Sequence, residues 1–323
     1  MVMNKVACNS CGSNENIPLY SASDYITKTR HHLVECKTCG LTYVSPQPSK
    51  AELPRFYPDD FYYREEPFFY DKINAGSRYK ALLRIIGKRK GRILDAGCGR
   101  GILLKLFKNA GWEAFGTELS DVSARYAREV LGLEVLNRGI EDCNFGSGIF
   151  DVITLFHSLE HLREPMLSLN IIKNILKPEG LLIIVVPRFN SFYSNIFKDK
   201  WFHLDVPRHL FHFDDRSIEK LLAAAGFEII KVKRYALLYD SFGALQSILN
   251  YICSEPNLLN NINTGRNRVK DIIKSGKKRL MVDTIMSYLL QFILFPPLFI
   301  LAAFLAIFNI GGTLTVSAKK KLL

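Results

Sequence analysis

Apolar runs of strand length alternate with segments of helical periodicity through the middle of the chain. In the helical segments apolar residues recur every three or four positions, and glycine or proline closes most of them. This alternation predicts βαβ units, and therefore an open, mostly parallel sheet covered by helices. Ligands of such sheets bind at the carboxyl ends of the strands. We expect strands over residues 92–96, 113–117, 134–137, 151–156, 181–186 and 227–235, and helices over residues 101–110, 122–131, 164–176 and 214–225.

A long uncharged segment follows the sixth predicted strand. No charged residue stands between Asp283 and Lys319, and residues 292–308 are wholly apolar. About 20 apolar residues are enough to span a bilayer, but the Pro296-Pro297 pair in the middle would interrupt a helix. We therefore expect a helical hairpin of two short helices, residues 285–295 and 298–308, bent at the prolines.

We expect this apolar segment to be an insertion in the sheet rather than a tail. Residues 313–318 have the β-branched alternation of a strand. Because six strands precede them, the chain has to return to the sheet. The hairpin would then dip into one membrane leaflet or lie on it. The alternative is that it forms a homodimer interface or packs on its own domain.

The positive charge of the chain is concentrated beside the apolar segment. Of a net charge of +12, residues 262–280 contribute half, with seven basic residues and one acidic residue. Basic residues on both flanks predict that both ends of the segment lie in the cytoplasm. We expect residues 262–311 to hold the protein on an anionic membrane surface. Since the N-terminus lacks an apolar signal segment, the expected location is cytoplasmic, peripheral or monotopic at the inner face of the membrane.

The composition is that of an ordinary globular chain of about two domains. Of 323 residues, 48% are hydrophobic and 23% charged, which excludes a mostly disordered chain. The basic balance also suggests nucleic-acid binding, but residues 1–48 hold four basic and three acidic residues and so form no basic patch. We therefore expect no nucleic-acid partner. The expected organisation is a small ribbon (1–48), an aromatic-rich lid or linker (49–90), an α/β domain (91–236 and 312–320) and the insertion (237–311).

Two pairs of cysteines stand near the N-terminus in the pattern CxxC…CxxC. Cys8 and Cys11 are separated from Cys36 and Cys39 by 24 residues. Four thiolates at this spacing can surround one zinc ion tetrahedrally. Since cysteine fills all four positions, no open coordination site remains for catalysis. The pattern predicts a structural zinc that folds a small ribbon; the alternative is four free thiols.

A glycine-rich loop joins the first predicted strand to the next helix. Residues 95–101 read DAGCGRG, whereas a dinucleotide fingerprint would have its third glycine one place later. Glycines let the backbone approach a ligand closely, and the helix N-terminus behind them favours an anion. Glu118 ends the second strand, 21 residues after Gly97, where a carboxylate can accept both hydroxyls of a ribose. We expect a nucleoside-containing ligand; the alternative is a tight structural turn.

The ordered motifs of this region resemble those of class I S-adenosylmethionine-dependent methyltransferases. They are LDAGCGRG, FGTELS, RGIEDCNF, FDVITLFHSLEHLREP and LKPEGLLIIVVP. The paired cysteines, CGLTYVSPQPS and WFHLDVPRHLFHF further resemble zinc-ribbon methyltransferases of cell-surface polysaccharide gene clusters, whose core is similar to ubiquinone-biosynthesis O-methyltransferases. The resemblance runs from about Arg92 to Lys320. It implies a Rossmann-like, mostly parallel sheet of seven strands with an antiparallel last strand, and S-adenosylmethionine as the cofactor.

The resemblance also implies which residues contact the cofactor. The glycine loop would lie along the methionine part, with Asp95 at the amino group. Glu118 would hold the ribose, and Leu119 would lie against the adenine. The complete implied set is Asp95, Gly97, Gly99, Gly101, Glu118, Leu119, Ile140, Glu141 and Phe156.

Histidines gather after the fourth and fifth predicted strands. A hydroxyl acceptor needs a base, and histidine is the most suitable because its pKa is near neutral. We expect His157 and His209 as candidate bases, with Glu160 and His161 beside them. Alternatively, Glu160 and His161 pair with each other and fix the loop. The three histidines within residues 203–212 could bind a metal, but no carboxylate stands at HExxH-like spacing to them.

The expected activity is methyl transfer to a hydroxyl oxygen of a small or lipid-linked glycan-type acceptor. A quinone or phenolic acceptor and C-methylation of a nucleotide sugar are the alternatives within the same class. The aromatic stretch 56–70 would stack on a sugar ring or pack on the sheet as a lid. The alternatives from other classes are a zinc-ribbon nucleic-acid-binding protein and a catalytically inactive membrane scaffold.

Overall fold

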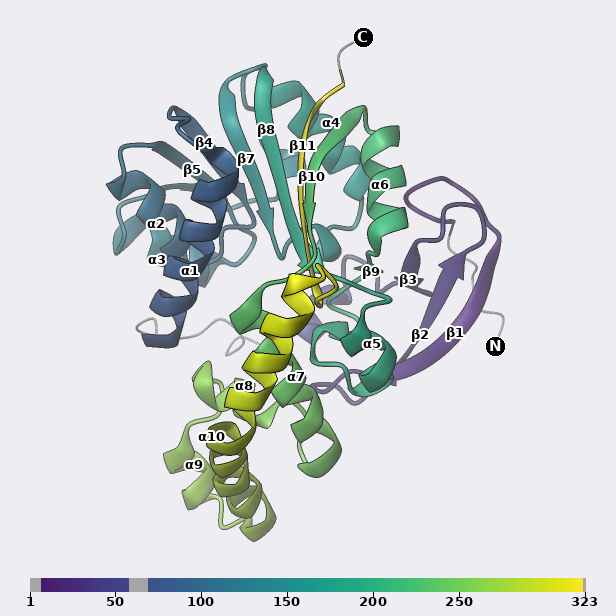
Figure 1. The fold of residues 1–323 in the computed structure, drawn as a ribbon, viewed down its shortest axis with the longest axis vertical. Helices are drawn as coiled ribbons and strands as arrows, with labels where there is room; N and C mark the ends of the chain where they lie inside the picture. The colour runs from purple at the N-terminus through teal and green to yellow at the C-terminus, as the bar shows by residue number, and fades with distance from the viewer. Residues whose placement is uncertain (1–6, 58–68, 322–323) are drawn as a thin grey trace.

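A computed structural model describes residues 7–57 and 69–321 as two sheets flanked by helices (Figure 1). Neighbouring strands from β8 to β6 run parallel, whereas β11 runs antiparallel between β8 and β10. This confirms the Rossmann-like sheet with an antiparallel last strand. The order across the larger sheet is β10 (Phe227–Lys233), β11 (Thr313–Lys320), β8 (Leu176–Pro187), β7 (Phe150–Phe156), β4 (Arg92–Ala96), β5 (Glu113–Thr117) and β6 (Glu134–Leu136).

Successive strand residues point into two apolar clusters on opposite faces of this sheet, as the period of two requires. Ile93 and Val152 pack against α1 (Phe69–Ile86), α2 (Ile102–Asn109) and α3 (Asp121–Glu129). Leu94 and Ile153 pack against α4 (Pro165–Ile175) and α6 (Asp215–Ala224). The carboxyl ends of β4, β5 and β7 therefore lie at one rim of a well-covered sheet.

The cysteine-bearing segment forms a second, antiparallel sheet together with a strand from the α/β domain. Its order is β1 (Asn16–Ser23), β2 (Arg30–Cys36), β3 (Thr42–Val44) and β9 (Phe211–His212). Because β9 comes from the long connection after β8, the ribbon is not a separate body. Cys8 and Tyr43 belong to the same apolar cluster as Phe211.

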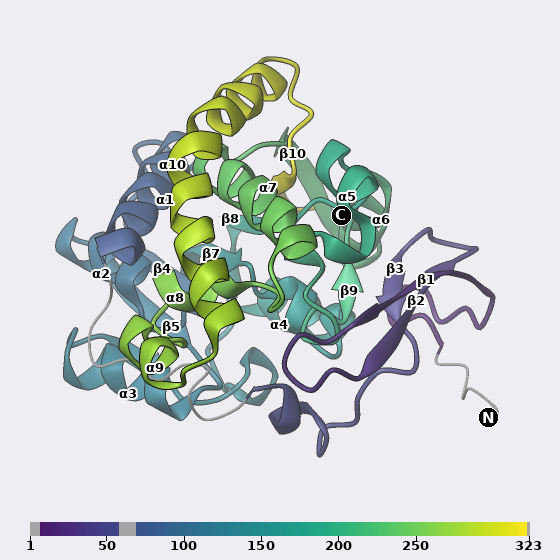
Figure 2. The same cartoon turned by 90° about the horizontal axis from the view of Figure 1, so that it is seen from below.

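Four helices stand between β10 and β11, so the apolar segment is an insertion. They are α7 (Leu237–Ile252), α8 (Leu258–Asn263), α9 (Val269–Lys274) and α10 (Lys278–Ile307), and α7 and α10 lie side by side (Figure 2). The expected pair of short helices is wrong, because α10 continues through Pro296 and Pro297. The prolines remove two amide donors from the helix, but residues before and after them, Leu294 and Leu298, pack on the α7 cluster and hold the two halves in one helix.

Most of the aromatic stretch expected to form a lid lies outside the described residues. Of its side chains the structure describes Phe56 and Tyr57. The Phe56 ring lies edge-on to His31, with 5.4 Å between centroids, and the Tyr57 hydroxyl is 3.3 Å from His161 Nδ1.

A short helix, α5 (Phe192–Phe197), follows β8.

Candidate functional site

The glycine loop is tied to the neighbouring strand at the carboxyl rim of the sheet. The amides of Gly97 and Cys98 donate to the Thr117 carbonyl, at 2.9 and 3.0 Å. Gly97 and Gly99 both have positive φ, +81° and +55°, a region that favours glycine. A Cβ on Gly97 would lie 2.7 Å from Ser158 Cβ, whereas a Cβ on Gly99 would enter open space. At Gly99 the loop therefore presents backbone without a side chain to a cavity.

This cavity has a volume of about 350 Å³ and contains part of the expected cofactor site. Asp95, Gly97, Gly99 and Phe156 line it, as expected from the motifs. Gly101 does not; it begins α2, and a Cβ there would lie 2.5 Å from Leu133 Cδ1, so this glycine serves close packing. The remaining wall comes largely from residues that the sequence did not single out, among them Asn74, Ala75 and Arg78 of α1, Ser123 of α3 and Arg266 of the insertion.

Two carboxylates stand at this rim with different partners. Asp95 is buried and accepts a 2.6 Å hydrogen bond from Thr154 Oγ1. Burial raises the pKa of Asp95 to about 6, although Thr154 and the Arg78 guanidinium act to lower it. Glu118 accepts from the amides of Gly99 and Ser120, both at 2.8 Å. Burial also raises the pKa of Glu118.

The expected adenine-side residues lie on the segments that flank Glu118. Asn137 Nδ2 donates to the carbonyls of Glu118 and Leu119, at 2.9 and 3.1 Å, and so fixes this turn. The Leu119 side chain is 74% exposed, whereas Ile140 is buried. Glu141 accepts a short hydrogen bond from Ser168 Oγ. Leu119, Ile140 and Glu141, like Glu118, are not among the described residues that line the cavity.

The residues present fit S-adenosylmethionine. Each oxygen of the Glu118 carboxylate accepts one amide hydrogen bond and keeps a lone pair for a ribose hydroxyl. Asp95 offers a carboxyl group for an amino group at the other side of the loop. The open space at Gly99 leaves room between them for a ligand against the backbone.

Histidines after β7 and β8 meet at the same end of the sheet. His157 has a φ of +52°, which is unusual for a residue with a side chain, and its Nδ1 lies 3.3 Å from Glu160 Oε1. The Tyr239 ring, from α7, stacks between His157 and His203 at centroid distances of 4.3 and 4.1 Å. Sequence reasoning missed Tyr239, because no local motif contains it.

Glu160, His161 and His209 come together in this cluster, with donor atoms within 4.8 Å of one another. His161 Nδ1 lies 2.9 Å from the Arg208 carbonyl, and His209 Nδ1 lies 2.9 Å from the His203 carbonyl. A carbonyl only accepts, so each Nδ1 carries the proton and each Nε2 keeps a lone pair. From the sequence, a metal site at the histidines of residues 203–212 is disfavoured because no carboxylate stands at HExxH-like spacing to them. In the folded protein, Glu160 places a carboxyl group near His209.

Burial sets the protonation states of the cluster. It lowers the pKa of His161 to about 3 and that of His209 to about 4, and it also lowers the pKa of His157. It raises the pKa of Glu160 to about 8. At neutral pH the imidazoles are therefore neutral and Glu160 is mostly protonated. Glu160 contacts His157 and not His161, with which the alternative interpretation pairs it, and its Oε2 has no hydrogen-bond partner among the described residues.

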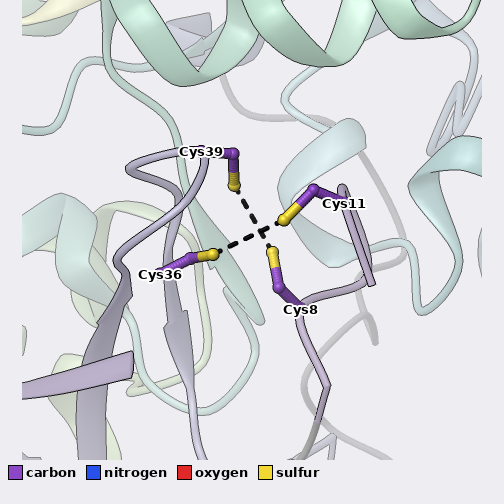
Figure 3. Close-up of side chains that lie close together, drawn as sticks. All are labelled: Cys8, Cys11, Cys36 and Cys39. Carbon is purple, nitrogen blue, oxygen red and sulfur yellow. Dashed lines mark hydrogen bonds between the residues drawn. The ribbon is translucent and has the colours of Figure 1, made fainter. Parts of the chain in front are cut away.

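The four cysteines of the ribbon converge on one point (Figure 3). The Sγ atoms of Cys8 and Cys39, and those of Cys11 and Cys36, are 3.5 Å apart. Four thiolates at about 2.3 Å from one zinc ion would stand about 3.8 Å apart. Each pair is followed by a glycine with positive φ whose amide donates to the first cysteine's carbonyl. The donor set and its spacing fit a tetrahedral zinc ion.

Comparison with known proteins adds sequence and fold relatives. Residues 70–232 match the family model of a methyltransferase domain. The chain is 36% identical over 103 residues to the ubiquinone biosynthesis O-methyltransferase of Actinobacillus pleuropneumoniae serotype 7, covering 28% of this chain and 43% of that protein. The protein of the same name from Cereibacter sphaeroides is 29% identical over 124 residues, 36% of this chain and 50% of that protein. The chain thus spans about half the length of the curated relatives it matches.

A solved structure shares the fold over a longer stretch. Phosphoethanolamine N-methyltransferase 2 of Haemonchus contortus, in complex with S-adenosyl-L-methionine, superposes with a TM-score of 0.51 at 17% identity and covers 76% of this chain and 52% of that chain. At this identity the likeness concerns the fold. Since the family model matches half of the sequence, and the sheet order agrees with it, the chain belongs to the class I S-adenosylmethionine-dependent methyltransferases.

Proposed function

We propose that the protein transfers a methyl group from S-adenosylmethionine to a hydroxyl oxygen of a small or lipid-linked glycan-type acceptor. One observation carries this proposal: the cavity and the histidine cluster adjoin at the end of β7. Phe156 lines the cavity, and the next residue, His157, belongs to the cluster. A cofactor against the glycine loop would therefore lie beside neutral imidazoles.

The chain's own residues bind and orient the reactants. Gly97 and Gly99 present backbone to the methionine part, while Glu118 and Asp95 offer carboxyl groups to the ribose and the amino group. The Arg78 guanidinium lies 4.5 Å from the centre of the Phe156 ring and fixes this wall of the cavity. Holding the reactants in line accounts for a large share of the rate of such transfers.

Proton removal falls to the histidine cluster. S-adenosylmethionine, when bound, supplies a methyl group on a sulfonium that is already a good leaving group. The acceptor hydroxyl loses its proton as its oxygen bonds to the methyl carbon, and a neutral imidazole, His157 or His209, takes that proton. Glu160, His203 and His209 are buried, which limits the access of water to this side of the cluster.

The insertion supports an acceptor that arrives with lipid. It supplies Tyr239 to the histidine cluster and Arg266 to the cavity wall, and it also carries α10 with its exposed apolar residues. An acceptor bound beside these residues would reach the centre from the side of the insertion. Together with the motifs that resemble those of polysaccharide-cluster methyltransferases, this supports our proposal of a role in polysaccharide biosynthesis.

A phenolic acceptor is the second candidate. Two curated relatives, which match 28% and 36% of this chain, are ubiquinone biosynthesis O-methyltransferases. The stacking of Tyr239 on His157 and His203 supports this candidate, because the aromatic surfaces of this cluster suit a flat ring.

We further propose that Cys8, Cys11, Cys36 and Cys39 hold a structural zinc ion. All four donors are thiols at one point, and this leaves no coordination position for a substrate. The ion would hold the turns that begin the ribbon sheet.

A transfer screen with methyl-labelled cofactor tests the activity. Polyprenyl-linked glycans, nucleotide sugars and phenols are offered in parallel, and products are examined by mass spectrometry. We expect label on an oxygen of a glycan-type acceptor and none with Gly99→Ile, whose side chain would fill the cavity. Label on a phenol, or on carbon, would replace the proposed acceptor with the corresponding alternative. Cofactor binding without transfer to any of these classes would overturn the proposal.

A further inference from the structure

Helix α10 exposes an apolar face along its whole length. It is long and apolar enough to cross a membrane by length and composition, yet only 11% of its most apolar window is buried. We define its outer face by Val282, Ile285, Leu289, Phe292, Ile300 and Ile307, of which Phe292 is 78% and Ile307 77% exposed. These positions recur every three, four or seven to eight residues and so share one side of the helix. An apolar strip of this length is unusual on a protein that stays in water.

The opposite side of α10 packs on the protein. Its inner face includes Leu294 and Leu298, which contact the α7 cluster around Leu245, and Leu305, which is buried beside Trp201. The one acidic residue of the helix, Asp283, is also buried and accepts a 2.8 Å hydrogen bond from the Ser254 amide. The outer face therefore carries no carboxylate.

The attachment of both helix ends argues against a spanning orientation. The last turn leads through Asn309, whose Oδ1 accepts a 2.7 Å hydrogen bond from the Arg234 amide, directly into β11 in the middle of the sheet. At the other end α9 and α8 contact α10. If α10 crossed a bilayer, it would separate from α7 and β11 would leave the sheet. If α10 lies flat on the membrane, both its packing on α7 and the pairing of β11 are kept.

The approach to α10 supplies the matching charge. Exposed Arg268, Lys270, Lys274, Lys277 and Lys278 precede or begin the helix. Within α9, Ile273 is 57% exposed next to Lys274. Basic residues beside an exposed apolar face are the mark of a helix that lies in the interface of an anionic membrane. A second copy of the chain would cover the apolar face but bring no carboxylate to these lysines from its own outer face.

We propose that the outer face of α10 and the basic residues 268–278 dock the protein, in one orientation, on an anionic lipid surface. The helix lies along the interface with its outer face among the acyl chains and the lysines on the head groups. The same insertion supplies Arg266 to the cofactor cavity, so docking brings that side of the protein to the lipid. This inference does not depend on the identity of the acceptor, and its test requires no turnover.

Vesicle flotation of the full chain tests it. Vesicles of phosphatidylcholine alone are compared with vesicles of phosphatidylcholine mixed with phosphatidylglycerol. We expect the protein to float with the mixed vesicles and to partition about tenfold or more weakly to the neutral ones, since each basic residue near an anionic surface contributes to binding. High salt should weaken but not abolish flotation, because the apolar contribution is not screened.

Matched variants separate the two contributions. Phe292→Asp with Ile300→Asp should abolish flotation, and Lys270→Glu with Lys274→Glu should remove the preference for phosphatidylglycerol. Leu167→Asp is the control, because Leu167 is 44% exposed on α4, away from the insertion. Thermal unfolding of each variant shows that the fold is retained. Phe292→Trp adds a readout without a charge change: its fluorescence should be quenched by brominated lipid.

Two outcomes would overturn the inference. One is failure of the wild-type protein to float with the mixed vesicles. The other is flotation that persists in the folded Phe292→Asp/Ile300→Asp variant. If the wild-type protein instead sediments as a dimer that these substitutions convert to a monomer, the outer face is a contact between copies of the chain.

Discussion

Glu118 joins the glycine loop to the expected ribose position. Its carboxylate already holds the Gly99 amide, so Glu118→Ala removes a ligand contact and loosens the loop. We expect S-adenosylmethionine binding to weaken by roughly 1.5–3 kcal/mol, the scale of hydrogen bonds to a charged group. Calorimetry measures this loss. Glu113→Ala, at the other end of the same strand and paired with Arg92 at the surface, is the control; equal affinities in the two variants would remove Glu118 from the site.

His157 is the histidine next to the cavity wall. With His157→Asn, we expect kcat to fall by about 10²–10⁴-fold while the affinity for S-adenosylmethionine stays unchanged, because a base contributes only to transfer. Single-turnover rates and calorimetry on the same protein separate the two effects. His32→Asn, in the ribbon sheet beside Ser21, should leave both unchanged. Full activity of His157→Asn would leave His209 as the candidate base.

Burial of the Glu160 carboxyl predicts that the free energy of unfolding falls as pH rises from about 4.5 to about 8. Burial raises its folded pKa to about 8 from the ordinary value of 4.5, so between these values the folded state holds a proton that the unfolded state has lost. Stability from this group is complete below pH 4.5 and is lost as pH rises toward 8, by at most about 1.4 kcal/mol per pH unit. Urea unfolding at pH 6.5 and pH 8 should show the decline in the wild type and less of it in Glu160→Gln.

Burial of the histidines predicts that, in the acid range, the free energy of unfolding rises with pH. Their folded pKa values lie below the ordinary value of 6.5, at about 3 for His161 and His203 and about 4 for His209. Stability from these groups is complete above pH 6.5 and is lost as pH falls through the folded values. We therefore expect the stability maximum near pH 6.5, where the two slopes meet. A maximum at pH 8 or above would contradict the burial of Glu160 as an uncharged acid.

Single residues of the site differ in how far the sequence could identify them. Asp95, Gly97 and Glu118 stand at fixed spacing within one strand–loop–helix unit, so local pattern was sufficient. Arg78, Tyr239 and Arg266 reach the same region from α1 and from the insertion. No short-range spacing connects them to the loop, because only the tertiary packing brings their elements together.

At the scale of elements, β4 and β5 have the bounds that the apolar pattern predicts. Each is a short run with apolar residues that is bounded by polar residues or glycine, so neighbouring residues determine where the strand begins and ends. The hairpin prediction failed for the reverse reason. The sequence shows the local cost of Pro296 and Pro297, but it does not show α7, whose packing on both sides of the prolines keeps α10 continuous.

The ribbon element depends on its cysteines. With Cys36→Ser, we expect about one zinc ion per chain to be lost and the ribbon sheet to open, including β9 because it pairs with β3. Metal analysis and amide hydrogen exchange over residues 7–57 and 205–213 measure both effects. Cys253→Ser, in the insertion, is the control and should keep its zinc. A wild-type protein without zinc would contradict the ribbon assignment.

At the scale of the whole molecule, Arg208 fastens the ribbon to the α/β domain. Its fully buried guanidinium contacts Asp24 of the ribbon at 2.8 Å and Asp205 at 2.7 Å, and it donates to the Phe56 carbonyl at 3.1 Å. Arg208→Met leaves the buried Asp24 without this partner, so we expect unfolding free energy to fall by about 3–5 kcal/mol. Denaturant unfolding measures the fall.

A second substitution identifies the cause of that loss. In Arg208→Met/Asp24→Asn the unpaired buried charge is gone, so part of the lost stability should return. Arg125→Met, whose partner Asp121 is exposed, should cost less than about 1 kcal/mol. If the double variant is no more stable than Arg208→Met, the loss of stability does not come from an unpaired Asp24 carboxylate. The ribbon is then held on the α/β domain by other contacts.

The place of β11 in the sheet has a consequence for how the chain is made. β11 is the last strand in the sequence but not the last in the sheet, because it pairs with β8 on one side and β10 on the other. A ribosome has to release residues 313–320 before these two strands can be joined. Until then β8 presents an unpaired apolar edge, and the insertion is covalently connected to the larger sheet only through β10. A growing chain therefore exposes this edge from the completion of β8 at Pro187 until residues 313–320 have emerged, and any chain that stops before Thr313 keeps the edge exposed and prone to aggregation.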